Sequence, residues 1–172
     1  MKSNESAYAE QLAWLAEHPQ ALTALIGAAG EQRGWWQADC AWSRRFARFD
    51  PLDAPLSLPY CTLLFESEGE RQHFCAVEIH SQPVVLESEY EIGVACAPLG
   101  WLKLTRFPCD RALPTLPEVL KEAVQARVIR YRPHLRCTLR ARADREESVA
   151  FVKVFSDAYG AAIHETSVLL WD

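Results

Sequence analysis

The chain has 172 residues, of which 49% are hydrophobic, and it carries six tryptophans and a formal net charge of -5. This length suits one compact domain or two small ones, and the apolar content excludes a disordered chain because it can build a substantial core. The negative charge argues against general affinity for nucleic acid or acidic membranes, although seven of the fourteen arginines fall between Arg127 and Arg145.

The N-terminal segment and the cysteines bear on the location of the protein. Residues 1–18, MKSNESAYAEQLAWLAEH, have polar side chains where a signal peptide needs an uninterrupted apolar core, and no later segment offers the roughly 20 apolar residues of a membrane span. We therefore expect a cytoplasmic protein. The six cysteines lie far apart, without a C-x-x-C pair or a histidine at zinc-ligand spacing, which predicts reduced thiols packed as small hydrophobic side chains.

The first half of the chain changes from a helical to a strand-like pattern. Apolar residues at helical spacing from Ala7 to Ile26 predict two short amphipathic helices, interrupted at His18-Pro19, that pack on a sheet. An antiparallel sheet is predicted from Gln37 to Lys103. Its strands are expected in ADCAWSRRFARFD, in the hairpin CTLLFE and HFCAVEIH around the polar turn SEGER, and in one or two segments between Tyr90 and Lys103.

A proline-punctuated connector, FPCDRALPTLPEVLKEAVQA, leads from this half into a predicted helix near Pro117 to Ala126. The connector is the best candidate for a domain boundary. This boundary divides the chain into a cap-like region, residues 1–126, and a second segment, residues 127–172. In the second segment, RVIRYRP and CTLRAR alternate with a period of two, a third strand runs from Val149 to Phe155, and GAAIHETSVLLW returns to helical spacing. The predicted fold class is therefore α+β, with N-terminal helices packed on an antiparallel sheet, followed by a three-stranded antiparallel unit and a helix.

Lys153 is unusual because it lies in the middle of the apolar run VAFVKVF. It shares one side of the strand with Phe151 and Phe155, and the opposite side is also apolar, which predicts an interior strand. A lysine there needs an anionic partner or room to extend its head into water, since an unpaired buried ammonium costs several kcal/mol. The alternative is a structural lysine that reaches water from the edge of a sheet.

The stretch VIRYRPHLRCTLRAR, followed by VAFVKVFSD and GAAIHETSVLLW, resembles the N-terminal part of bacterial phosphotransferases of the aminoglycoside phosphotransferase/choline kinase-like group, which have a protein-kinase-like fold. The segment FPCDRALPTLPEVL supports the resemblance, which covers the cap-like region only loosely. It implies that Lys153 binds the α and β phosphates of ATP and that Phe151 borders the adenine. It also places Arg136 directly after the loop that covers the phosphates, and Glu165 on the helix as the carboxylate that pairs with the lysine. In the complete enzyme, ATP and Mg²⁺ are the expected cofactors.

The catalytic residues of this group have no counterpart in the chain. Phosphoryl transfer in this fold needs an H-x-D-x-x-x-x-N segment and a metal-binding aspartate, and only Asp157 and Asp172 follow Lys153. We therefore expect the nucleotide-binding lobe of an ATP-dependent small-molecule phosphotransferase, inactive alone, with its catalytic lobe absent from this chain and its acceptor unidentified. Its expected partners are that lobe and a second copy bound through the exposed lobe face, and neither nucleic acid nor membrane. A noncatalytic binding or regulatory module is the alternative, and an arginine-based nucleic-acid binder is the weakest of the three readings.

Overall fold

The computed structural model describes residues 4–37, 40–49, 59, 61–68, 72–142, 149–157 and 160. Internal contacts divide the chain into two compact units, Met1–Phe107 and Pro108–Asp172. Within the described residues there are three helices and two antiparallel sheets, one of five strands and one of three, so the predicted α+β class is confirmed. None of the described helices is long and apolar enough to cross a membrane.

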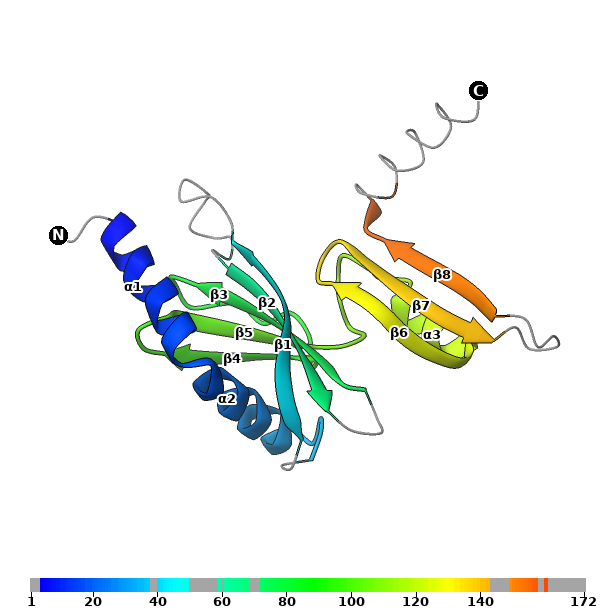
Figure 1. Cartoon of the computed structure of the whole chain (residues 1–172), viewed down its shortest axis with the longest axis horizontal. Coiled ribbons are helices and arrows are strands. Elements are labelled where there is room, and N and C mark those ends of the chain that lie inside the picture. Colours follow the sequence, from blue (N-terminus) through cyan, green and yellow to red (C-terminus); the bar gives the residue numbers. More distant parts are fainter. Residues whose placement is uncertain are drawn as a thin grey trace, which may run out of the picture. The chain divides into compact units, whose positions relative to one another are not determined.

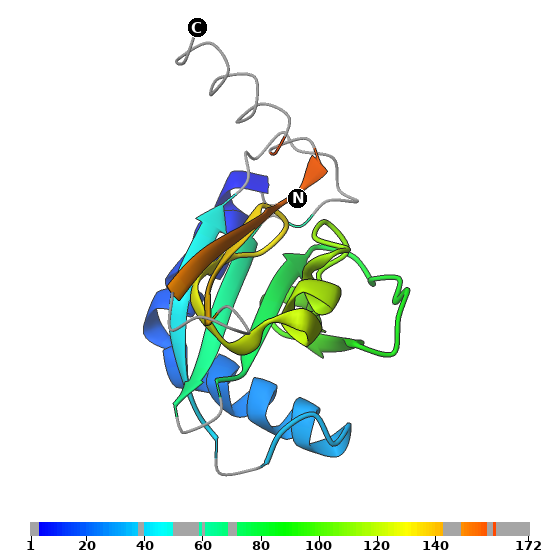
Figure 2. The ribbon, with the colours of Figure 1, turned by 90° about the vertical axis from the view of Figure 1, so that its right-hand side faces the viewer.

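The first unit places two helices on one face of a five-stranded sheet (Figures 1 and 2). Both helices were predicted, and the chain breaks between them at His18, directly before a proline at the first helical position, where its missing N–H is not needed. The sheet order is β1-β2-β3-β5-β4, and every neighbouring pair is antiparallel. The predicted hairpin is confirmed as β2 and β3. The elements are α1 (Asn4–Glu17), α2 (Pro19–Gln32), β1 (Ala41–Phe49), β2 (Cys61–Glu68), β3 (Phe74–His80), β4 (Glu91–Cys96) and β5 (Gly100–Arg106).

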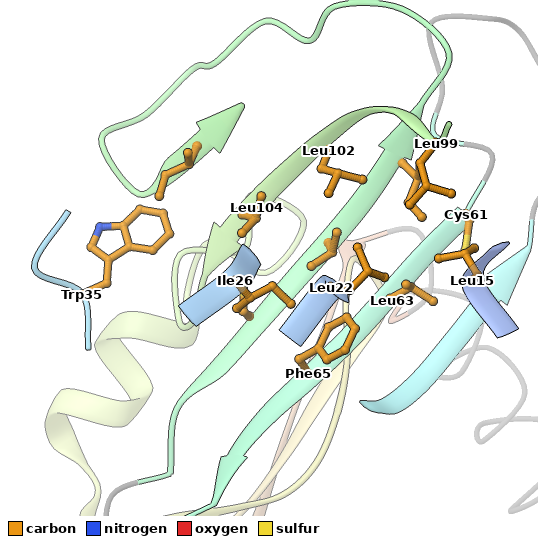
Figure 3. Close-up of a cluster of buried hydrophobic side chains, with 14 of the residues drawn as sticks. Leu15, Leu22, Ile26, Trp35, Cys61, Leu63, Phe65, Leu99, Leu102 and Leu104 are labelled. Atoms are coloured by element: carbon orange, nitrogen blue, oxygen red, sulfur yellow. The ribbon is translucent and has the colours of Figure 1, made fainter. Parts of the chain in front are cut away.

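The core of this unit lies between α2 and the sheet (Figure 3). Because side chains alternate along a strand, every second residue of the central strands points toward the helices. Leu22 and Ile26, one helical turn apart on α2, pack against this layer. The fully or almost fully buried strand residues include Leu63, Phe65, Val77, Ile79, Leu102 and Leu104.

The described residues of the second unit form a short helix and a three-stranded antiparallel sheet of order β6-β7-β8. The helix contacts β6. The three strands follow one another in the predicted order, and β6 and β7 are joined by the predicted tight turn between Arg132 and Arg136, closed by a bond from the Leu135 N–H to the Arg132 carbonyl (3.1 Å). The elements are α3 (Leu116–Glu122), β6 (Val124–Arg132), β7 (Arg136–Arg142) and β8 (Val149–Phe155).

The junction between α3 and β6 differs from the prediction. The helix was expected to continue to Ala126, but Ala123 already has extended backbone dihedrals and Val124 pairs with Arg142 of β7. Sheet pairing therefore begins within the segment whose composition favours a helix. The contacts also place α3 with the three-stranded sheet, whereas the sequence-based division fell after Ala126. The predicted helix over Gly160 to Trp171 and the turn over Ala143 to Glu147 lie outside the described residues, Gly160 apart.

Candidate functional site

The three-stranded sheet has two chemically different faces because its side chains alternate. The inner face is apolar and buried, and Val128 of β6, Leu139 of β7 and Val154 of β8 are among its members. We call the opposite side of the sheet the outer face. Its members are the strand residues that alternate with these buried positions and pair with one another across neighbouring strands. They are Arg127, Arg130, Arg132, Arg136, Thr138, Arg140, Arg142, Val149, Phe151, Lys153 and Phe155.

The outer face is strongly cationic. Seven of its residues are arginines or a lysine, while the sequences of β6, β7 and β8 contain no aspartate or glutamate. The protein as a whole is acidic, so this concentration of positive charge is local. Charges of one sign that are grouped on one surface attract anionic ligands and raise their local concentration.

Lys153 lies on this face and is exposed to solvent. Its strand is an edge strand of the described sheet, so the expectation of an interior strand was wrong. The prediction rested on the apolar residues on both sides of β8. In the structure Val149 and Phe151 are exposed, and of the residues of this strand only Val154 is buried. Lys153 pairs with Thr138 across the strands and makes no ion pair or side-chain hydrogen bond within the described part of the chain.

Three of the four residues predicted to bind the cofactor share the outer face. Arg136 pairs with Phe155, Thr138 with Lys153 and Arg140 with Phe151, so that Arg136 and Phe151 occupy the positions on either side of the lysine. Phe151 is 64% exposed, which is high for a phenylalanine and leaves its ring accessible. The Nε atom of Arg136 is shielded from solvent and has no hydrogen-bond partner among the described residues. The fourth residue, Glu165, lies outside the described residues.

The turn between β6 and β7 is held by a buried carboxylate that the sequence analysis did not find. Asp110 accepts hydrogen bonds from the Tyr131 hydroxyl (2.8 Å) and the His134 amide (2.8 Å) through Oδ2, and from the Ala112 amide (3.0 Å) through Oδ1. The His134 ring Nδ1 lies 3.2 Å from Oδ1. His134 has a positive φ of 63°, an uncommon conformation that these bonds stabilise. We call the side chains of Asp110, Tyr131 and His134 the Asp110 clamp.

The electrostatics of the Asp110 clamp favour the ionised carboxylate. Burial by itself raises the pKa of Asp110, but the hydrogen bonds and charge of His134, together with the Tyr131 hydroxyl, outweigh it and hold this pKa below its ordinary value. The neighbouring Cys137 behaves oppositely, since burial and the negative charge of Asp110 raise its pKa to about 12. This thiol is therefore neutral at physiological pH and is no candidate nucleophile.

A second ionic cluster lies in the first unit, on neighbouring strands of the five-stranded sheet. Lys103 Nζ lies 3.2 Å from Glu91 Oε1 and 3.5 Å from Glu78 Oε2, and the His80 ring lies 3.3 Å from the same Glu78 oxygen. Glu91 also accepts a bond from the Glu87 amide (2.7 Å). Because all these charges are already paired with one another, we interpret this cluster as a structural network.

Metal ligands are not gathered in the described part of the chain, where no three His, Cys, Asp or Glu side chains are arranged to hold an ion. All six cysteines are free thiols, as predicted.

Comparisons of the chain with protein-family models, with curated proteins and with solved structures found no match.

Proposed function

We propose that the outer face binds ATP and that the chain is the nucleotide-binding part of an ATP-dependent small-molecule phosphotransferase similar to the aminoglycoside phosphotransferase/choline kinase-like group. In this proposal Lys153 and Arg136 hold the phosphates and Phe151 borders the adenine. The transfer chemistry belongs to a catalytic lobe outside the chain, whose acceptor specificity is open.

One observation carries the proposal: an exposed lysine without an acidic partner among the described residues lies between an arginine and an exposed aromatic ring. The chemistry of each group suits a nucleotide. Lysine provides a compact positive charge, arginine donates two parallel hydrogen bonds to a phosphate, and an exposed ring offers an apolar surface to a base.

The turn at residues 133–135 determines how phosphates can be bound at that end of the face. Pro133 has no N–H, the His134 amide is bonded to Asp110, and the Leu135 amide is bonded to Arg132. The backbone donors that a glycine-rich loop would present to phosphates are therefore already used within this turn. Binding must rely on side chains, which gives Arg136 and Lys153 a larger share of the affinity.

The metal and the location complete the proposal. Mg²⁺ would be coordinated by ATP and by residues outside the described part of the chain, because no carboxylate lies on the strands of the outer face. We propose a cytoplasmic location, since ATP-consuming enzymes and six free thiols both fit a reducing compartment. A noncatalytic binding module remains the alternative, and it would use the same face without turnover.

The proposal predicts that Lys153→Met weakens binding of an ATP analogue by about tenfold or more, because a charge-assisted bond to phosphate is lost while the apolar stem is kept. Lys121→Met is the matched control, since Lys121 is an exposed lysine of the same unit at the end of α3. Fluorescence titration of the chain with a labelled analogue measures both. Equal affinities of the two variants would contradict the assignment of Lys153, provided that their circular dichroism spectra match the wild type.

A further inference from the structure

A pocket with three arginines opens on the outer face, away from the turn that joins β6 and β7. Its volume is about 310 Å³, and residues of all three strands line it. Arg127 lies directly opposite Arg140, and Arg142 pairs with Val149 of β8. Gln125 contributes the remaining polar group, and its Oε1 accepts a bond from Arg142 Nη1 (3.4 Å). We call this the arginine pocket, and the described residues that line it are Gln125, Arg127, Arg140, Ala141, Arg142 and Val149.

The charges of the arginine pocket are not compensated within the described residues. Arg127 and Arg140 make no ion pair or side-chain hydrogen bond there, and the side-chain hydrogen bond of Arg142 goes to the neutral Gln125 amide. Like charges directly opposite each other on antiparallel strands destabilise a sheet. Arg127 and Arg140 are such a pair, with Arg142 on the same pocket, and a bound anion would stabilise this arrangement.

The composition of the arginine pocket indicates the class of anion. Guanidinium groups bind phosphate through paired, parallel hydrogen bonds, and the Gln125 amide adds a neutral polar group to the lining. The volume lies at the lower end of the range for small-molecule sites. The net charge of -5 disfavours a long polyanion such as nucleic acid, which would also meet the acidic remainder of the molecule.

We propose that the arginine pocket binds a phosphate-type oxyanion carried by a small molecule. The pocket extends away from the position assigned to the ATP phosphates. Arg140 pairs with Phe151, two residues from Lys153 along β8, and Val149 is four residues from Lys153, or about 13 Å at the rise of a strand. None of the pocket residues is Lys153, Arg136 or Phe151. The inference therefore goes beyond the proposed function and stands without it.

The test uses inorganic pyrophosphate as the probe and isothermal titration calorimetry of the full chain at physiological salt. We expect saturable binding by the wild type, and a loss of about tenfold or more in affinity for Arg140→Gln, which removes one charge-assisted contact. Arg130→Gln is the matched control: it removes the same charge from the same face, but Arg130 does not line the pocket. We expect the control to remain within about twofold of the wild type, because Arg130 does not line the pocket and salt weakens the attraction of charges that do not touch the anion.

Three outcomes would overturn the inference. Absence of saturable pyrophosphate binding by the wild type would exclude the site. Equal losses for Arg140→Gln and Arg130→Gln would show general electrostatic attraction to the face. Tighter binding of a short single-stranded oligonucleotide than of pyrophosphate, weakened by Arg140→Gln, would assign the face to nucleic acid. A thermal midpoint for each variant shows whether it is folded, and Arg127→Gln replaces Arg140→Gln if that variant unfolds. The comparison of Lys153→Met with the wild type in an ATP-analogue titration tests the nucleotide site, and the comparison of Arg140→Gln with Arg130→Gln in the pyrophosphate titration tests the arginine pocket, so the two proposals can fail independently.

Discussion

Gly30 occupies a position on α2 where only a hydrogen atom fits as a side chain. A Cβ atom built there would overlap the indole ring of Trp36, which is anchored by its Nε1 donating to the Gly27 carbonyl (3.1 Å). Trp36 in turn packs edge-on against Trp35 and Trp42. The ring is therefore held from several sides and cannot move away without disturbing the core.

Gly30→Ala should consequently lower the free energy of unfolding by about 1–3 kcal/mol, as overpacked core substitutions do. Gly27→Ala is the control on the same helix, where a Cβ meets no atom within 4 Å. That substitution should stabilise the protein by up to about 1 kcal/mol through helix propensity alone. Urea denaturation followed by tryptophan fluorescence measures both variants. A stabilising effect of Gly30→Ala would show that the Trp36 ring is not fixed.

Asp110 should make the second unit sensitive to acid. Its pKa is lower in the folded chain than the ordinary value of 3.8, so its ionised form contributes stability that is fully present above the unfolded pKa. That contribution is lost as the pH falls through the folded pKa. Asp110→Asn should therefore lower the free energy of unfolding at neutral pH by about 1–3 kcal/mol. The difference in this free energy between the variant and the wild type should shrink below pH 3.8.

The matched control for this prediction is Asp157→Asn, which changes the same charge at an exposed position of the same unit. We expect this control to stay within about 0.5 kcal/mol of the wild type. The measurement is urea denaturation followed by circular dichroism at several pH values. A difference between wild type and Asp110→Asn that does not vary with pH would show that the aspartate stabilises the turn through its shape and not through its charge.

At the scale of the elements, alternation and turn composition were sufficient to predict most strands. The hairpin of β2 and β3 and the turn between β6 and β7 were found because polar turn residues separate runs with a period of two. The start of β6 was missed because tertiary pairing overrode helix propensity at Val124, and a positive φ of 51° at Gln125 accompanies irregular pairing there. Bulges of this kind leave no periodic signal in a sequence.

The candidate site was predictable only where its residues share one strand pattern. Lys153 and Phe151 stand two residues apart, so alternation places both on one face, whereas the position of Arg136 beside them depends on the register between β7 and β8. Asp110 was not found because it contacts Tyr131 and His134 from 21 and 24 residues away, a separation that no local pattern encodes. The edge position of β8 was also missed, because an apolar run of this length fits an interior strand equally well.

Self-association through the exposed lobe face stays a prediction. The residues of the outer face include some that favour it and others that oppose it. Exposed Val149 and Phe151 offer apolar contact area on an edge strand, which favours pairing with a second copy. Seven cations on the same face oppose it, because two copies would bring like charges together. A multivalent anion such as ATP would reduce this repulsion.

At the scale of the whole molecule, the proposed function separates nucleotide binding from phosphoryl transfer. Transfer requires a base that orients the acceptor and acidic ligands for the metal, and the proposal assigns both to the catalytic lobe. The sequence contains no H-x-D-x-x-x-x-N segment after Lys153. Binding of ATP by this chain should therefore have no chemical consequence for the nucleotide.

We expect the purified chain, incubated with Mg²⁺ and ATP, to release phosphate at the rate of a buffer blank, since positioning alone cannot replace the charge stabilisation that the metal and its ligands supply. A coupled phosphate assay measures this, with Lys153→Met as the comparison. Turnover above the blank that Lys153→Met abolishes would place catalytic residues within this chain and reject the division into two lobes. Turnover that Lys153→Met leaves unchanged would show that Lys153 does not act in the responsible site, because a phosphate ligand cannot be removed from such a site without effect.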